Sequence, residues 1–131
     1  MKKLPIIASA VAALAVQSAA FAGFQSHSLV SVYKSSSGGS AYGSMYSARY
    51  YSSDSSQYIG CLSASDTVSS TYITCAARNA QNVVLTCYST TADGQARQAV
   101  ASVNPTSAIY FAVDSSGKCT YISIGNYSYN L

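Results

Sequence analysis

Residues 58–75 read YIGCLSASDTVSSTYITC, and this stretch contains nearly the same four-residue phrase twice, YIGC at its start and YITC at its end. In an extended strand, residues two apart point to the same side. Ile59 and Cys61 therefore share one face of the first phrase. Ile73 and Cys75 do the same in the second, while the tyrosine and the small residue of each phrase point the other way. The stretch predicts two neighbouring strands, each with an apolar inner face and a polar-aromatic outer face.

Further β-prone runs continue on both sides of this stretch, separated by residues that favour turns. Predicted strands cover residues 29–32, 41–52, 56–63, 70–77, 83–90, 107–114 and 118–124, whereas residues 95–103 fit either a strand or one or two helical turns. About six to eight short strands of this kind are typical of an antiparallel sandwich or a small barrel. We therefore predict an all-β domain.

The composition points to the same fold class. The chain has 131 residues, with no glutamate, no tryptophan and 12 tyrosines, and only 8% of its residues are charged. Glutamate and lysine, which favour exposed helix positions, are rare, whereas tyrosine, threonine and valine favour strands. A largely helical architecture is disfavoured on these grounds.

The N-terminus has the pattern of a secretory leader. The chain begins MKK, residues 4–16 form an almost continuous apolar run, and AFA at residues 20–22 supplies a small-x-small cleavage site. We predict a bacterial signal peptide over residues 1–22, cleaved after Ala22, and a secreted, periplasmic or extracellular mature chain. The apolar run is shorter than the roughly 20 residues that span a bilayer, and no later segment reaches that length.

The predicted mature chain divides into a short segment and one domain. Residues 23–40 are polar and end in SSSGGS, which predicts a flexible N-terminal segment. Residues 41–131 then form a single disulfide-stapled β domain of ordinary size.

The charge that remains after cleavage is small. The charged side chains beyond the leader are Lys34, Arg49, Arg78, Arg97, Lys118, Asp54, Asp66, Asp93 and Asp114, a net charge of about +1. A nucleic-acid-binding protein normally carries a basic stripe, and five scattered cations do not make one. The sequence therefore argues against a nucleic-acid partner.

Four cysteines, Cys61, Cys75, Cys87 and Cys119, predict two structural disulfides in an exported chain. Of the three pairings, we favour Cys61–Cys75 with Cys87–Cys119. Pairing centred near residue 68 places Cys61 opposite Cys75 on antiparallel strands. A tight two-residue loop within residues 78–82 would instead put Cys75 and Cys87 on opposite faces. No CxxC pair is present, so neither a zinc site nor a redox motif is predicted.

The side chains that catalysis needs are nearly absent, and we predict that the protein is not an enzyme. The single histidine, His27, lies in the polar N-terminal segment, which does not suit a Ser-His-Asp arrangement. The four aspartates fall in or beside turns, where carboxylates cap backbone amides. No glycine-rich phosphate loop is present, and no cofactor or metal is predicted, although a calcium site built from loop aspartates is a minor alternative.

Tyrosine is the one residue type whose abundance the fold alone does not explain. If residues 41–52 form a strand, Tyr42, Tyr46 and Tyr50 share one face, with Tyr51 beside them. The tyrosines either cover an antiparallel sheet, or form a recognition face, or promote self-association at weakly charged sheet edges. The candidate ligand-binding residues are Tyr42, Tyr46, Tyr50 and Tyr51.

These observations favour a secreted, non-catalytic binding module that acts at the cell surface or outside the cell. Proteins and glycans are the partners that an exposed tyrosine face suits. A structural subunit of an extracellular assembly or matrix is the alternative, because it would use the same residues for self-association. A secreted toxin or enzyme inhibitor is a weaker third hypothesis.

Overall fold

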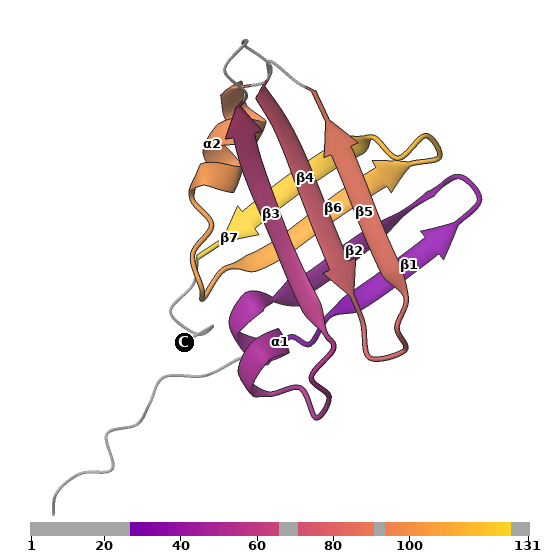
Figure 1. Ribbon diagram of the computed structural model, residues 1–131, viewed down its shortest axis with the longest axis vertical. Coiled ribbons are helices and arrows are strands. Elements are labelled where there is room, and N and C mark those ends of the chain that lie inside the picture. The colour runs from indigo at the N-terminus through magenta and orange to yellow at the C-terminus, as the bar shows by residue number, and fades with distance from the viewer. Residues whose placement is uncertain (1–26, 66–70, 91–93, 127–131) are drawn as a thin grey trace, which may run out of the picture.

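The computed structural model describes residues 27–65, 71–90 and 94–126, and these form seven strands and two short helices (Figure 1). In chain order the elements are β1 (Ser31–Ser35), β2 (Gly38–Ser44), α1 (Met45–Tyr50), β3 (Tyr58–Ser65), β4 (Thr71–Arg78), β5 (Val84–Ser89), α2 (Gly94–Ala101), β6 (Ala108–Asp114) and β7 (Cys119–Gly125). Strands dominate, so the predicted all-β class is confirmed.

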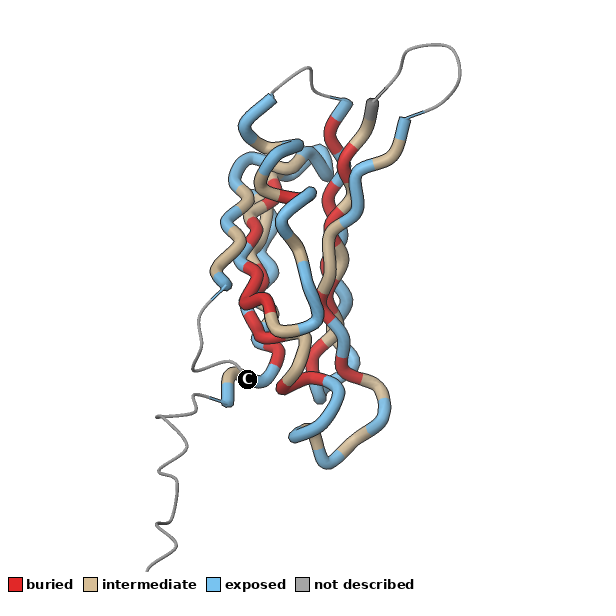
Figure 2. The backbone as a smooth tube through the Cα atoms, turned by 90° about the vertical axis from the view of Figure 1, so that its left-hand side faces the viewer, coloured by how far each residue is buried: buried red, intermediate tan, exposed pale blue. Residues whose placement is uncertain are grey.

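The strands form two antiparallel sheets with the orders β1-β2-β6-β7 and β3-β4-β5. Figure 1 shows the three-stranded sheet lying across the four-stranded one, with α2 beside β3 and β7 and α1 at the opposite end of β3. Figure 2 shows the two layers from the side, with buried positions along both. The predicted sandwich is therefore the observed architecture, and of the two conformations predicted for residues 95–103 the helical one is found, over Gly94–Ala101.

The core lies between the two sheets and follows the alternation of the strands. On β6, Ile109, Phe111 and Val113 face inward, and Phe111 and Ile109 are fully buried. Ile73 on β4 meets them from the other sheet and is also fully buried. A period of two residues thus puts one face of each strand in the core, as the sequence predicts.

The two YIxC phrases form the hairpin of β3 and β4. Cys61 pairs with Cys75 across the two strands, and Ile59 and Ile73 are both buried. Residues 66–70, where the predicted centre of this pairing falls, lie outside the described residues. The register itself confirms the prediction.

The structure departs from the expected flexible segment over residues 23–40. Residues 31–44 form the β1–β2 hairpin, so the expected domain boundary at residue 41 falls inside β2. The Gly/Ser run is needed for this hairpin: Gly38 has a φ of 138°, and a Cβ there would collide with the carbonyl oxygen of Val113 on β6. Glycine is thus needed here for the backbone conformation of a turn and for a close contact between strands, and it does not mark a flexible segment.

The predicted strand over residues 41–52 is wrong beyond Ser44. Residues 45–50 form α1, and Ser44 caps it by accepting a hydrogen bond from the Ser47 amide at 3.3 Å. Serine is a preferred N-cap, and methionine, alanine and arginine favour helix. The helix buries only the small side chains of Ser47 and Ala48, which lets it lie close to the sheets.

Both predicted disulfides, Cys61–Cys75 and Cys87–Cys119, are present, but one argument for them is wrong. Cys75 and Cys87 lie directly opposite each other on β4 and β5, and both are buried. The connecting loop has five residues rather than two, because the Asn79 side chain accepts hydrogen bonds from the amides of Gln81 and Val83 and holds a wider turn. An odd number of loop residues keeps the two cysteines on the same face.

Candidate tyrosine-rich binding site

The four candidate tyrosines do not form one row. Tyr42 lies on β2, Tyr46 and Tyr50 lie on α1, and Tyr51 follows that helix directly. Because residues 45–50 are helical, Tyr46 and Tyr50 are one helical turn apart and their ring centroids lie 4.7 Å from each other. The structure thus brings three of the four together and places Tyr42 on a separate surface.

His27, Tyr46, Tyr50 and Tyr51 form what we call the helix cluster. The ring centroids of Tyr46 and Tyr51 are 5.8 Å apart, and the His27 ring lies 3.7 Å from that of Tyr51. The sequence indicated that His27 lies in a loose terminal segment, yet it stacks on this cluster. No local pattern predicts that contact, since the two residues meet only through the fold.

A hollow of about 560 Å³ opens beside the helix cluster. The exposed residues Tyr50 and Tyr58 line it, and Met45 and Ile59 contribute apolar surface. Arg49 also lines the hollow, with its guanidinium carbon 5.9 Å from the Tyr50 ring centroid. Tyr58 was not among the candidate residues, although its outward position on β3 follows from the alternation of the YIGC phrase.

The polar wall of the hollow is built by Asp54 and Gln57. One carboxylate oxygen of Asp54 accepts hydrogen bonds from the amides of Ser56 and Gln57 and from the Ser56 hydroxyl, at 2.6–2.9 Å. The other accepts from the Gln57 side chain, whose own oxygen accepts from the Val30 amide at 3.1 Å. This network fixes the loop between α1 and β3 against the segment that leads into β1, and so holds the hollow open in a defined shape.

The predicted role of the aspartates as turn caps is confirmed for the two that lie in the described residues. The Ser56 hydroxyl, together with the Gln57 side chain, holds the pKa of Asp54 well below its usual range. Asp114 has a lowered pKa because it accepts a hydrogen bond from the Ser116 hydroxyl and another from the Lys118 amide. Asp66 and Asp93 fall outside the described residues.

Replacement of Asp54 by asparagine should destabilise the protein at neutral pH. It should also make the free energy of unfolding fall less as the pH is lowered. A carboxyl whose pKa is lower in the folded state stabilises the fold above its unfolded pKa, about 3.9, and this contribution disappears as the pH falls further. Urea unfolding at pH 7 and at pH 2–3 measures the effect. The difference between the wild type and Asp54→Asn should shrink in acid, and a constant difference would contradict the role of ionised Asp54.

Tyr42 belongs to a second group, the sheet cluster, on the outer face of the four-stranded sheet. It pairs across the strands with Tyr110 on β6, and the Tyr110 ring meets that of Tyr121 on β7 at 5.7 Å between centroids. Tyr33 on the edge strand β1 faces the same side. The Tyr42 hydroxyl lies 3.4 Å from the Ser28 hydroxyl, next in the chain to His27, so the two clusters adjoin.

The described part of the chain also bears on two other features, a metal site and a membrane-spanning helix. Among these residues the one close group of metal-ligand side chains is Cys75, Cys87 and Cys119, and all three are engaged in disulfides. The described helices, of six and eight residues, are too short to cross a membrane.

Comparison of the chain with protein-family models, with curated proteins and with solved structures finds no match. The chain is thus a small disulfide-stapled β sandwich that presents tyrosines at one end and on the outer faces of both sheets.

Proposed function

We propose that this chain is a non-catalytic binding module, exported and active at the cell surface or outside the cell, which holds its ligand in the hollow beside the helix cluster. The observation that carries the proposal is the pair of exposed tyrosines, Tyr50 and Tyr58, that line one hollow together with apolar and polar side chains. Concave sites of this mixed character are where proteins commonly bind ligands. The two disulfides suit an oxidising compartment.

A neutral glycan is the ligand class that this site fits best. A sugar ring has an apolar face, which can lie on an aromatic ring, and a rim of hydroxyl groups, which need polar partners. The tyrosines supply the first kind of contact, while Arg49 and the ordered loop at Asp54 supply the second. The few, scattered charges of the chain favour a neutral ligand over a polyanion.

Single replacement of Tyr50 or Tyr58 by serine should weaken glycan binding at least tenfold with little loss of stability. Both residues are exposed, and substitutions at exposed positions usually change stability by about 0.5 kcal/mol or less. Tyrosines often carry a large share of the contact energy at binding surfaces. Binding is measured by screening the mature protein on immobilised neutral oligosaccharides and then titrating the best ligand, with intrinsic tyrosine fluorescence as the signal.

Tyr88→Ser is the matched control, because Tyr88 is 50% exposed, between Tyr58 at 43% and Tyr50 at 64%. It lies on β5, in the same sheet as Tyr58, but does not line the hollow. Its affinity should equal that of the wild type. If Tyr121→Ser in the sheet cluster abolishes binding and Tyr50→Ser does not, the ligand lies on the sheet instead. Absence of binding to every neutral oligosaccharide would contradict the proposed ligand class.

Assembly into an extracellular structure is a second candidate function, favoured by the low charge of the outer sheet faces. Among the described outward positions of β3, β4 and β5, Arg78 is the one charged side chain, and it donates two hydrogen bonds to Asn82. Charge normally protects sheet surfaces and edges from pairing with other chains. Sedimentation of the mature protein over a range of concentrations tests this: concentration-dependent polymers support assembly, and a strict monomer contradicts it.

A further inference from the structure

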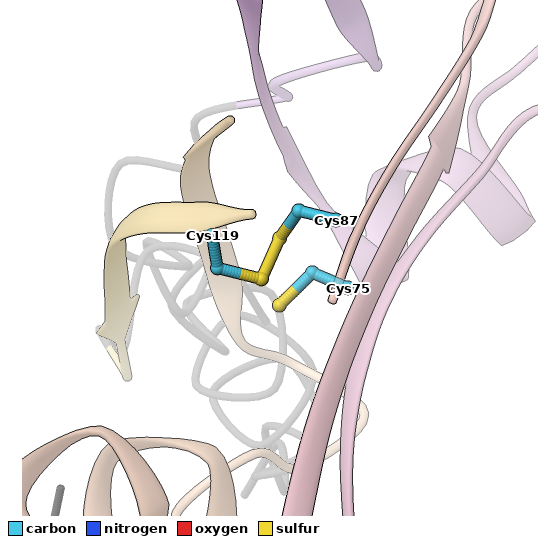
Figure 3. Close-up of side chains that lie close together, drawn as sticks. All are labelled: Cys75, Cys87 and Cys119. Atoms are coloured by element: carbon cyan, nitrogen blue, oxygen red, sulfur yellow. A yellow bond between two sulfur atoms is a disulfide. The ribbon is translucent and has the colours of Figure 1, made fainter. Parts of the chain in front are cut away.

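All four cysteines lie on one level of the sandwich. Cys61, Cys75 and Cys87 are directly opposite one another across β3, β4 and β5. Cys119 reaches them from β7 in the facing sheet, through its bond to Cys87. Figure 3 shows the Cys75 sulfur beside the Cys87–Cys119 bond, and the sulfur atoms of these three residues all lie within 4.8 Å of one another. Two disulfides are thus in near contact.

The four sulfur-bearing residues differ in access to solvent. Cys75 is fully buried and Cys87 is 2% exposed, whereas Cys61 and Cys119 are partly exposed. Solvent therefore reaches the first disulfide on the side of Cys61 and not of Cys75, so we expect an external thiolate to attack the Cys61 sulfur. Attack at Cys61 makes Cys75 the leaving group and releases its thiolate inside the protein, beside the second disulfide.

We propose that Cys61 is a modification site for an external thiol, and that its modification opens the Cys87–Cys119 bond through Cys75. In the first step an external thiolate bonds to the Cys61 sulfur as the Cys61–Cys75 bond breaks, and the electron pair leaves on Cys75. In the second step the Cys75 thiolate attacks the Cys87–Cys119 disulfide, bonds to one sulfur and expels the other as a thiolate. Each step exchanges one disulfide for another, so the external thiol is the one co-reactant.

The neighbouring position of Cys75 is what makes the second step fast. A nucleophile held beside its target reacts as if at a very high concentration, which an external thiol does not reach. Attack on Cys87 links β4 to β5 and frees Cys119, and the one covalent bond between the two sheets is then lost. Attack on Cys119 keeps a bond between the sheets and frees Cys87. The exchange therefore converts a surface modification into a change in how the sandwich is held together.

The wild-type protein gives a direct test. The folded mature chain is incubated with glutathione at pH 8, where more of the thiol is ionised, and the mixture is quenched with acid, alkylated and mapped by mass spectrometry. We expect glutathione on Cys61, a new linkage from Cys75 to Cys87 or Cys119, and an alkylated third cysteine. Glutathione on Cys61 with an alkylated Cys75 and an intact Cys87–Cys119 bond would overturn the proposal.

Two variants separate internal exchange from direct attack on the second bond. In Cys61→Ser the Cys75 thiol is already free, and a fraction of the purified protein should carry Cys75 linked to Cys87 or Cys119. In Cys61→Ser/Cys75→Ser the internal nucleophile is gone, and glutathione should open Cys87–Cys119 at least tenfold more slowly than in the wild type. Near-ultraviolet circular dichroism confirms that each variant is folded. Equal opening rates in the double variant and the wild type would overturn the proposal, and if either variant does not fold, the wild-type map decides.

Discussion

Replacement of Phe111 by alanine should lower the free energy of unfolding by about 3–5 kcal/mol, the usual cost of deleting a buried aromatic side chain. Phe111 is fully buried at the inner face of β6, between Ala41 on β2 and Ile122 on β7. Neighbouring side chains cannot move in to fill the space that its ring leaves, because β2 and β7 on either side of β6 are held in place by their backbone hydrogen bonds. Domains of this size are stable by about 5–15 kcal/mol, so the loss is a large fraction of the total.

Urea unfolding followed by circular dichroism measures this loss, and Tyr33→Ala is the control. Tyr33 lies in the same sheet but is 67% exposed on its outer face, so its removal should cost about 0.5 kcal/mol or less. Comparable losses for the two variants would mean that the inner and outer faces of the four-stranded sheet are wrongly assigned.

The strands with a clear two-residue period were predictable from the sequence. The YIGC and YITC phrases and the run SAIYFAVD each put apolar side chains on alternate positions, and β3, β4 and β6 follow that pattern. Cysteine placement added a constraint, because a disulfide between neighbouring strands fixes their register. These signals are local, so a single sequence contains them in full.

The segment 41–52 was not predictable, because its tyrosine spacing fits two conformations. Tyr42, Tyr46 and Tyr50 are four residues apart, and a spacing of four matches both the even period of a strand and the i, i+4 period of a helix. The choice between them depends on Ser44, which is buried and caps α1, and on the Ser107 carbonyl, which accepts a hydrogen bond from the Met45 amide. A contact with a residue 62 positions away leaves no trace in the local pattern.

The candidate site was predictable only where its residues are close in the sequence. Tyr46, Tyr50 and Tyr51 are close in the sequence and remain close in the fold. Tyr58 and His27 join them only because the loop held by Asp54 and Gln57 brings the start of β3 and the segment before β1 to the same end of the sandwich. Residue types thus indicated a tyrosine-rich surface, but its shape and its hollow depend on the tertiary structure.

Replacement of Cys87 and Cys119 together by alanine should lower the free energy of unfolding by about 4 kcal/mol. In the chain-entropy model a disulfide stabilises by closing a loop in the unfolded state, and the contribution grows with the length of that loop. Cys87–Cys119 spans 32 residues and joins β5 to β7 in the opposite sheet, whereas Cys61–Cys75 spans 14 residues within one hairpin.

The variant Cys61→Ala/Cys75→Ala provides the comparison, since the same model gives it a smaller loss of about 3 kcal/mol. Urea unfolding of both variants without reductant measures the two losses. The larger loss should belong to Cys87→Ala/Cys119→Ala, because the hydrogen bonds of β3 and β4 already hold Cys61 and Cys75 together. Between the two sheets, the described residues form few backbone hydrogen bonds. The reverse order would mean that interior packing, rather than the bond between the sheets, keeps the sandwich closed.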